Sequence, residues 1–408
     1  MKIVEKDFVP VLFGSDVNTY AMARAFYEEY GIKSIVIGKF PSGPSCNSKI
    51  IEYYSDLNIG RQEVFLKMVD DICKKYSNKK ILLIGCGDNY VELIVRNRSL
   101  FAKNVVAPYI DELLLEQLLT KKKFYEMCER YNLDYPKTLI YDKTMGNDLS
   151  LPFDFPVIVK PSNSIEYWKN DFPGQKKVYR ISNQEDLNDV VNQIYRAGYN
   201  DSLIIQEYIP GDDSFLRIMV SYSGKDKKVK LMSLAHVMLE EYTPMGLGST
   251  SVLITDYNQE LSDKIKTFLE EIGYTGFSTF DIKYDERDKK YKILEINCRQ
   301  GRSSSYVTGA GFNLAKYVAD EHIYNKSFDF QVVKNRILWI VIPLPIVYKY
   351  VKDKAHLAEI RQLIRDKKVF NPLFFKGDYG IKRLFYLCKS YLGQFIKYKK
   401  YYPRDFSG

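Results

Sequence analysis

The chain has 408 residues, of which 46% are hydrophobic and 27% are charged. This length allows two or three domains with a large core, and the composition excludes an intrinsically disordered protein. Six scattered cysteines without a Cys-x-x-Cys pair exclude a disulfide framework and a zinc site of that spacing, and they indicate reduced thiols. We find no signal-peptide pattern, and the longest apolar run, 337–347, is short and broken by prolines. We therefore expect a cytoplasmic protein.

Formal charge is uneven along the chain, which carries +9 in total. Residues 334–408 hold 17 Lys and Arg against 5 Asp and Glu, a net charge of +12 that leaves −3 for the rest of the chain. The sequence therefore predicts a slightly acidic body and a basic C-terminal extension, 331–408, that is rich in Lys, Tyr and Phe.

Residues 1–115 alternate buried strands with helices, which is typical of a parallel sheet covered on both faces. We expect strands at 8–13, 34–38 and 80–85 and helices at 19–30 and 63–76. Glycine-containing turns at 14–16 and 85–88 could bind an anion at a helix start, or they could simply be tight turns. This part is predicted to be an N-terminal α/β domain.

Two further subdomains follow in the prediction, a small α+β unit at 116–206 and a larger unit at 207–330. In the first we expect a helix at 111–131, strands at 138–140, 156–161, 174–180 and 203–211, and a helix at 183–197 capped by Asn183. In the second we expect antiparallel strands at 215–222, 229–236 and 251–254, a helix at 260–273, and two final strands that carry Asp281 and Glu295.

The strongest motif joins Asp281 to Glu295-Ile296-Asn297. Glu295 and Asn297 are two residues apart, so on a strand they point to the same face, and Asp281 lies on the preceding strand. Carboxylate and amide oxygens suit Mg²⁺, which keeps part of its shell for phosphates and water. The alternative is a solvated hairpin face. Both strands are apolar around these residues, and asparagine is disfavoured in strands, so we favour a metal site.

Lysines flank a polar loop farther upstream. Lys160 ends an apolar strand, and Lys177 follows the loop 162–175. Two such lysines could hold ATP phosphates as point charges, although each alone could be a solvated strand residue. The loop contains a single glycine, Gly174, and is therefore not a P-loop.

An acidic turn follows the strand that carries Gln206 and Glu207. A carboxylate at a strand end, followed by backbone groups and the pair Asp212 and Asp213, would suit adenine and ribose. The alternative is an ordinary turn set by proline and glycine. His236, predicted to end a strand, and Cys298 are more simply explained as structural residues.

The order of these residues resembles the ATP-grasp superfamily of carboxylate–amine ligases. The positions that carry the resemblance are Lys160, Lys177, Glu207, Asp281, Glu295, Asn297 and Arg299. The segment 120–124 matches the Asp-Lys-x-x-Phe start of that fold, with Thr120 in place of the acid. The resemblance covers about residues 8–330. It implies α/β and α+β architecture, with an N-terminal pre-ATP-grasp domain, a two-part ATP-grasp fold and the basic extension.

Within the superfamily, segments 8–24 and 160–167 look most like the D-aspartate ligases of Gram-positive bacteria. The resemblance implies a ligase that activates the β-carboxylate of D-aspartate with ATP and Mg²⁺, as one or two ions, or Mn²⁺. The acyl phosphate would then react with the lysine ε-amine of a UDP-linked muropeptide precursor in peptidoglycan biosynthesis.

The resemblance also implies roles for individual residues. Nucleotide binding would fall to Lys121, Lys160, Lys177, Glu207, Tyr208, Ile209, Asp212 and Asp213, and metal binding to Asp281, Glu295 and Asn297. The implied catalytic residues are Arg299, which would stabilise the phosphoryl group, and Arg302. The implied substrate contacts are Arg302, Ser303, Ser304 and Ser305. No general base is assigned.

Two alternatives of function stay open at this stage: a ligase for another amino acid or peptide acceptor, and a non-catalytic nucleotide-binding or membrane-surface module. The tail segment 397–402 interleaves lysines with tyrosines. It could contact an anionic membrane or the UDP-linked substrate, or it could be a solvated helix face. No nucleic-acid partner is expected.

Overall fold

The computed structural model describes residues 6–41, 43–146, 150–244 and 246–403. The chain forms two compact units. Unit 1 combines Met1–Leu115, Asp212–Phe280 and Asn297–Ser407, and unit 2 combines Glu116–Gly211 with Asp281–Ile296. Each unit is therefore built from segments that are distant in sequence.

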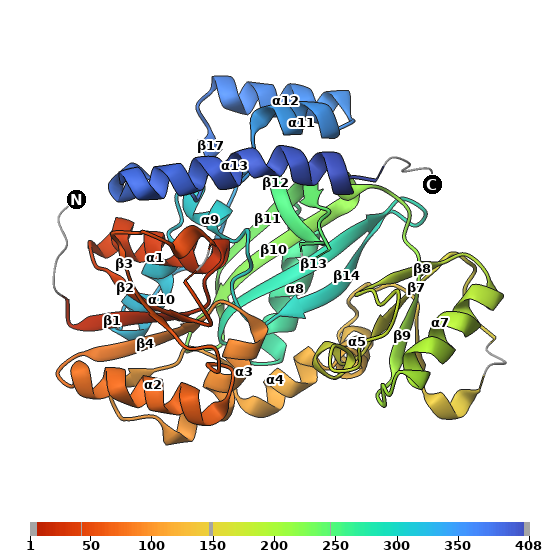
Figure 1. The fold of residues 1–408 in the computed structure, drawn as a ribbon, viewed down its shortest axis with the longest axis horizontal. Helices are drawn as coiled ribbons and strands as arrows, with labels where there is room; N and C mark the ends of the chain where they lie inside the picture. The colour runs from red at the N-terminus through yellow and green to blue at the C-terminus, as the bar shows by residue number, and fades with distance from the viewer. Residues whose placement is uncertain (1–5, 42, 147–149, 245, 404–408) are drawn as a thin grey trace. The chain divides into compact units, whose positions relative to one another are not determined.

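The N-terminal part of unit 1 is a five-stranded parallel sheet, as predicted, in the order β3-β2-β1-β4-β5. Its strands are β1 (Phe8–Phe13), β2 (Ser34–Gly38), β3 (Ile51–Ser55), β4 (Lys80–Gly85) and β5 (Val105–Val106). Its helices are α1 (Val17–Tyr30), α2 (Gln62–Lys75) and α3 (Asp88–Arg96). Helix α1 covers one face of this sheet and α2 the other (Figure 1). Strands β1 and β2 are buried along their whole length, which explains why their sequences are continuously apolar.

An eight-stranded sheet follows the order β14-β13-β10-β11-β12-β16-β17, with β15 paired to β11. Its strands are β10 (Leu216–Ser223), β11 (Val229–Glu241), β12 (Ser249–Asp256), β13 (Gly276–Asp285), β14 (Lys290–Asn297), β15 (Gln331–Val332), β16 (Leu338–Ile340) and β17 (Val369–Phe370). The associated helices are α8 (Gln259–Glu271), α9 (Ser305–Gly309) and α10 (Leu314–His322). The unit boundary crosses β13 after Phe280 and β14 after Ile296.

Strand β11 is longer than the sequence indicated. The prediction ended this strand at His236, but pairing with β12 continues through register shifts to Glu241. Register shifts at Val237/Leu239 and Leu239/Glu240 make the pairing with β12 irregular beyond His236. His236 is therefore an interior strand residue.

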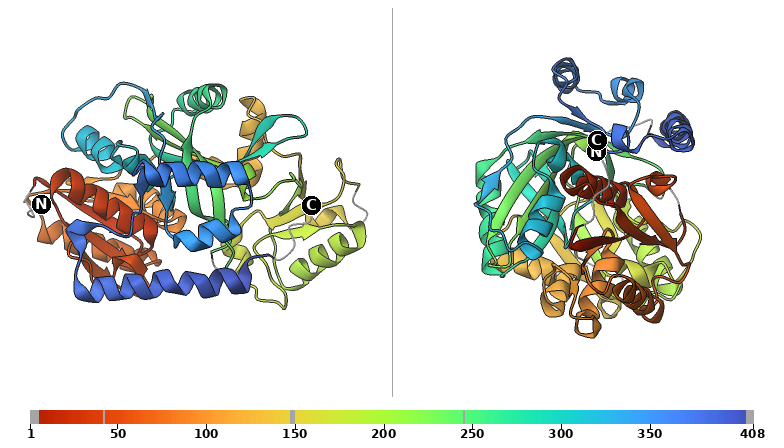
Figure 2. Two further views of the ribbon diagram at one scale, coloured as in Figure 1. Left: turned by 90° about the horizontal axis from the view of Figure 1, so that it is seen from above. Right: turned by 90° about the vertical axis from the view of Figure 1, so that its left-hand side faces the viewer.

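The C-terminal extension folds into three helices, α11 (Leu344–Tyr350), α12 (Lys354–Arg365) and α13 (Ile381–Tyr401). Helix α13 is a single straight element of 21 residues and lies beside the shorter α11 and α12 (Figure 2). Among the described residues, no helix is both long and apolar enough to cross a membrane.

Unit 2 contains a four-stranded antiparallel sheet in the order β6-β9-β7-β8. The strands are β6 (Thr138–Tyr141), β7 (Val157–Pro161), β8 (Tyr179–Ile181) and β9 (Leu203–Glu207). The helices are α4 (Glu112–Leu119), which begins in unit 1, α5 (Lys121–Arg130), α6 (Ser164–Tyr167) and α7 (Gln184–Arg196). Asn183 caps α7 by accepting from the amide of Asp186, which confirms the predicted cap.

Two predictions for unit 2 need correction. The helix expected at 111–131 is broken at Thr120, whose extended backbone separates α4 from α5. Lys177 lies before β8 and not within a strand, because β8 begins at Tyr179. The backbone of the neighbouring Lys176 forms hydrogen bonds with tyrosine hydroxyls and not with a neighbouring strand. Its carbonyl accepts from the Tyr167 hydroxyl at 2.8 Å, and its amide donates to the Tyr179 hydroxyl at 2.9 Å.

Candidate functional site

Unit 2 brings together three lysines and two carboxylates that the sequence singled out. Lys160 is the last residue but one of β7, and Lys121 begins α5 immediately after the break at Thr120. Asp281 and Glu295 come from the adjacent strands β13 and β14. Lys177 completes the set by acting electrostatically on Lys121, Lys160 and Glu295. Residues more than 170 positions apart are thus gathered in one charged cluster.

Burial and the repulsion between cations lower the pKa values of two lysines of this cluster, Lys121 and Lys160. Burial, together with the positive charge of Lys121, lowers the pKa of Lys160 to about 7, although Glu295 opposes the shift. Burial also lowers the pKa of Lys121. The cluster therefore holds three lysines against two carboxylates, as expected for a site that receives a polyanion.

Glu295 is the anion on which the lysines act. Burial alone would raise its pKa, but the charges of Lys121 and Lys160 and a hydrogen bond with Asp281 outweigh that effect and lower the pKa. Glu295 is therefore ionised at neutral pH. A carboxylate held charged beside a second carboxylate is a suitable ligand for a divalent cation.

The carboxylates Asp281 and Glu295 fit Mg²⁺ by their chemistry, and the role of Asn297 as a third ligand stays a prediction. Asp281 and Glu295 are hydrogen-bonded, and Asn297 follows Glu295 by two positions on β14. In the described parts of the chain, no group of three or more His, Cys, Asp or Glu residues could hold a metal ion. Two neighbouring carboxylates fit an ion that takes its remaining ligands from phosphates and water.

Tyr125 links the lysines to the hairpin within unit 2. Its hydroxyl donates to the carbonyl of Leu294 at 2.8 Å, and Lys160 Nζ approaches the same hydroxyl at 3.4 Å. A buried tyrosine from α5 thus fixes the end of β7 beside the strand that carries Glu295. No local pattern pointed to this residue, because its role depends on a contact 169 positions away.

The predicted adenosine residues divide between the two units. Glu207 in unit 2 pairs with Arg287 at 2.9 Å and accepts from the amide of Lys137 at 2.9 Å. Tyr208 is flanked by the cations of Arg180 and Lys283, 4.3 and 5.4 Å from its ring centre. Ile209 is buried. The sequence did not single out Arg287, which lies in the turn between β13 and β14.

Asp212 and Asp213 belong to unit 1, where both carboxylates have intramolecular partners. Asp212 accepts from the amide and hydroxyl of Ser214 at 2.9 and 2.6 Å. Asp213 accepts from the amide of Glu240 at 2.8 Å and from the hydroxyl of Tyr242 at 2.5 Å. Their assignment to the nucleotide stays a prediction.

Arg299 lies in the loop after β14, within unit 1. Its guanidinium pairs with Asp88 at 2.7 Å and donates to the side-chain oxygen of Asn297 at 3.2 Å. Asp88 is the first residue of α3 and ends the glycine turn at 85–88. That turn therefore contributes an acid that orients Arg299, which was not among its predicted roles.

Arg302, in the same loop, pairs with Glu241 at 3.0 Å. Lys397 from α13 approaches the other oxygen of Glu241 at 3.6 Å. The sequence did not predict either partner, because Glu241 lies beyond the expected end of β11 and Lys397 is 95 positions away from Arg302.

The serines after Arg302 are buried. Ser304 Oγ accepts from the amide of Gly301 at 2.6 Å, and Ser305 Oγ accepts from the indole of Trp339 at 2.8 Å. Ser303 is 4% exposed. Their hydrogen bonds hold the loop that carries Arg302, and a direct contact with substrate stays a prediction.

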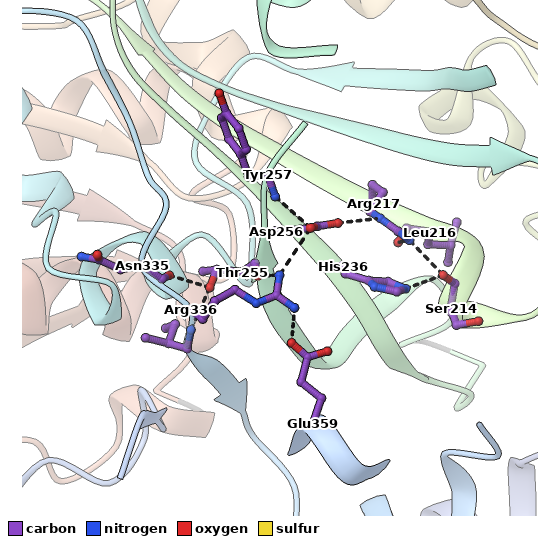
Figure 3. Close-up of polar contacts among 11 residues, drawn as sticks. Ser214, Leu216, Arg217, His236, Thr255, Asp256, Tyr257, Asn335, Arg336 and Glu359 are labelled. Carbon is purple, nitrogen blue, oxygen red and sulfur yellow. Dashed lines mark hydrogen bonds and ion pairs between the residues drawn. The ribbon is translucent and has the colours of Figure 1, made fainter. Parts of the chain in front are cut away.

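His236 belongs to a polar network between the sheet and the C-terminal extension (Figure 3). Its Nε2 lies 2.6 Å from the carbonyl of Ser214. Burial, together with the nearby charge of Arg217, lowers the pKa of His236 to about 4, so the ring is neutral. Arg336 joins Asp256 on β12 to Glu359 on α12 in the same network. These contacts fit the structural role expected for the histidine.

The surroundings of Cys298 also fit a structural role. This cysteine is 1% exposed, and burial raises the pKa of its thiol to about 12. A protonated, buried thiol is a poor nucleophile.

Comparison with known proteins supports the resemblance seen in the sequence. No protein-family model matches the chain. D-Aspartate ligase of Enterococcus faecium (strain Aus0004) is 40% identical over 412 residues, covering 97% of this chain and 98% of that protein. D-Alanine–D-alanine ligase of Lacticaseibacillus casei (strain BL23) is 23% identical over 161 residues, covering 38% and 42%.

Solved structures match the fold at low sequence identity. N5-carboxyaminoimidazole synthetase of Staphylococcus aureus superposes with a TM-score of 0.60 at 12% identity and covers 83% of each chain. L-Amino acid ligase of Bacillus licheniformis gives a TM-score of 0.54 at 15% identity and covers 78% of this chain and 75% of that one. These likenesses establish the ATP-grasp fold.

The fold and the near full-length relative define an ATP-dependent carboxylate–amine ligase. A non-catalytic module is thereby set aside. At 40% identity over almost the whole of both chains, the protein belongs to the D-aspartate ligase family.

Proposed function

We propose that this ligase joins the β-carboxylate of D-aspartate to the lysine ε-amine of a UDP-linked muropeptide precursor. The observation that carries the proposal is the 40% identity to a D-aspartate ligase along 97% of the chain. The cluster of Lys121, Lys160, Lys177, Asp281 and Glu295 supports it, because ATP-driven ligation needs cations for phosphates and carboxylates for Mg²⁺.

The proposed reaction has two steps. The carboxylate of the amino acid attacks the γ-phosphate of ATP, which gives an acyl phosphate and ADP. The amine of the acceptor then attacks the acyl carbon, inorganic phosphate leaves, and the amine nitrogen loses a proton. The first step depends mainly on positioning and on neutralising phosphate charge.

In this proposal Lys121, Lys160 and Lys177 bind the phosphates of ATP. Asp281, Glu295 and Asn297 hold Mg²⁺, which when bound neutralises charge on the β- and γ-phosphate oxygens. One or two ions, or Mn²⁺ in their place, are compatible with this donor set.

The remaining predicted residues complete the proposed site. Arg299, oriented by Asp88 and Asn297, would stabilise charge on the phosphoryl group and then on the tetrahedral oxyanion. The nucleoside contacts would be Glu207, Tyr208, Ile209, Asp212 and Asp213. Arg302 would bind the acid substrate in a loop that the three serines hold in place.

We further propose that the domains follow the superfamily pattern. Residues 1–115 would form the pre-ATP-grasp domain, 116–206 and 207–330 the two ATP-grasp subdomains, and 331–408 the extension.

A contact between the extension and an anionic membrane is also proposed, on the basis of one observation. Helix α13 exposes an apolar stripe, with side chains that are 91%, 72%, 63% and 73% exposed at Ile381, Phe385, Leu392 and Ile396. Exposed lysines lie beside this stripe, and an apolar face with basic flanks suits the surface of an anionic bilayer.

The function is tested by incubating the protein with ATP, Mg²⁺ and single amino acids, with and without the precursor, while ADP and phosphate are measured. We expect release with D-aspartate, little with L-aspartate, and a product whose mass equals that of precursor plus aspartate minus water. If ADP and phosphate are released only with a different amino acid, that amino acid is the substrate in place of D-aspartate. Absence of ADP release with every amino acid and the precursor would overturn the proposal.

A further inference from the structure

Unit 1 contains a cavity of about 360 Å³ that includes Arg302. Its walls include the turn after β1, the end of β11, the loop after β14 and helix α13, together with residues at 43–44, 251, 341–342 and 373. The volume is in the range of small-molecule sites, about 300–1,000 Å³. The C-terminal extension therefore contributes to a site that also holds a predicted substrate residue.

Helix α13 turns one face to this cavity. Tyr386, Ser390, Gln394 and Lys397 line it, at intervals of four, four and three residues. Such spacing places side chains on one side of a helix. The exposed stripe of Ile381, Phe385, Leu392 and Ile396 falls on the opposite side, so the two faces of α13 have separate roles.

The charges along the cavity alternate in sign. Glu241 lies between Arg302, at 3.0 Å, and Lys397, at 3.6 Å. Glu241 is only 7% exposed, and Thr243 donates to its Oε1 at 2.7 Å. Among the described residues, the buried Nε of Arg302 has no hydrogen-bond partner. Asp16 also lines the cavity, but its carboxylate caps α1 by accepting from Thr19.

This arrangement presents a positive, a negative and a positive group in sequence. Aspartate presents the opposite order: a carboxylate, an ammonium group and a second carboxylate. A ligand of that type could pair with all three protein groups. A ligand that lacks one of these charges would leave one protein group in the cavity without a partner and with less water around it.

We propose that this cavity binds the acid substrate as an amino dicarboxylate, with Lys397 contacting the α-carboxylate, Glu241 the ammonium group and Arg302 the carboxylate to be activated. The inference rests on the proposed function, because it names the substrate class of the same site. It gives the basic extension a part in substrate selection: α13 supplies the contact that distinguishes an amino dicarboxylate from a simple amino acid.

The position of Arg302 is compatible with this order of contacts. Arg302 lies five positions after Asn297, so their Cα atoms lie within about 18 Å of each other. Arg299, the proposed phosphoryl contact, is three positions away in the same loop. The loop that binds this carboxylate through Arg302 would therefore also carry the proposed phosphoryl contact, Arg299.

The test measures binding by calorimetry in the presence of ADP and Mg²⁺, so that it does not depend on turnover. The ligands are D-aspartate, β-alanine, which is aspartate without the α-carboxylate, and succinate, which lacks the ammonium group. The variants are Lys397→Met and Glu241→Gln. Lys399→Met is the matched control, since it removes one charge from the exposed side of the same helix.

We expect Lys397→Met to weaken D-aspartate binding about tenfold, because the lysine is half-exposed. Binding of β-alanine should not change, and Lys399→Met should match the wild-type protein. Glu241→Gln should weaken D-aspartate more than succinate.

Equal weakening of D-aspartate and β-alanine in Lys397→Met, or none, would overturn the inference. Turnover of the wild-type protein is measured separately. If D-aspartate binds as described but no ADP is released, the proposed function fails while the binding inference stands.

Discussion

The position of α13 depends on an ion pair that has no exposed side-chain surface. Arg383, in the first turn of α13, pairs with Asp378 at 3.0 Å, and both side chains are 0% exposed. Asp378 also accepts from Tyr20, Ser48 and the amide of Lys49 at 2.9, 2.8 and 2.5 Å. These partners come from the N-terminal sheet region, so the pair fixes the extension to the rest of unit 1.

Removing the guanidinium should therefore destabilise unit 1 strongly. Arg383 donates to the carbonyls of Pro44 and Cys46 at 2.6 and 3.1 Å, and its guanidinium lies 4.1 Å from the ring centre of Tyr20. Arg383→Ala leaves a buried carboxylate without its counter-ion and two carbonyls without a donor. Loss of one partner of a buried pair costs about 3–5 kcal/mol. We expect a loss of this size in the free energy of unfolding.

The assay is urea unfolding combined with limited proteolysis of the extension. Arg383→Lys is the control for charge, since lysine keeps the cation but loses the planar set of donors. The double variant Arg383→Met, Asp378→Asn should be more stable than the sum of the two single losses predicts, because it leaves no unpaired charge. A loss below about 1 kcal/mol in Arg383→Ala with an unchanged cleavage pattern, or strict additivity in the double variant, would refute the reasoning.

Three further predictions concern the site and the surface of the protein. Glu295→Gln should lower turnover at least about 100-fold with an unchanged circular dichroism spectrum, and near-normal activity would contradict its role as a metal ligand. Lys160 has a pKa of about 7 and contacts phosphate best when protonated, so ADP affinity should fall as the pH rises from 7 to 9. Lys160→Arg should remove that slope, and a slope that persists in this variant would have another source. Leu392→Ser with Ile396→Ser should abolish flotation with anionic vesicles at low salt, and flotation equal to the wild type would exclude the stripe as the contact.

The sequence was sufficient for those parts of the fold that depend on local patterns. The buried strands β1, β2 and β4 have continuous apolar sequences, and Asn183 is a residue type that commonly caps helices. The metal candidates could be recognised because Asp281, Glu295 and Asn297 are polar residues in apolar strands. In each case a short stretch of chain contains the whole signal.

Features that depend on distant contacts were missed or misplaced. The end of β11 was set too early because its last residues, up to Glu241, pair with the separate strand β12 through register shifts. Lys177 was assigned to a strand, since nothing in the local sequence shows that tyrosine hydroxyls bind the backbone beside it. Glu241 was not considered at all, because its partners Arg302 and Lys397 lie 61 and 156 positions away.

The structure revises the interpretation of the basic extension more than that of any other part of the chain. From the sequence, with its net charge of +12, the extension could contact an anionic membrane or the UDP-linked substrate, or form a solvated helix face. In the folded chain these cations have different surroundings: Arg383 is fully buried, Lys397 lines a cavity, and Lys399 is exposed to solvent. Replacing one of these cations should therefore change the stability of the protein, its affinity for substrate or its binding to a membrane surface, according to the position of the residue on α13. Total charge alone cannot predict which, because the helix periodicity decides which face each residue occupies.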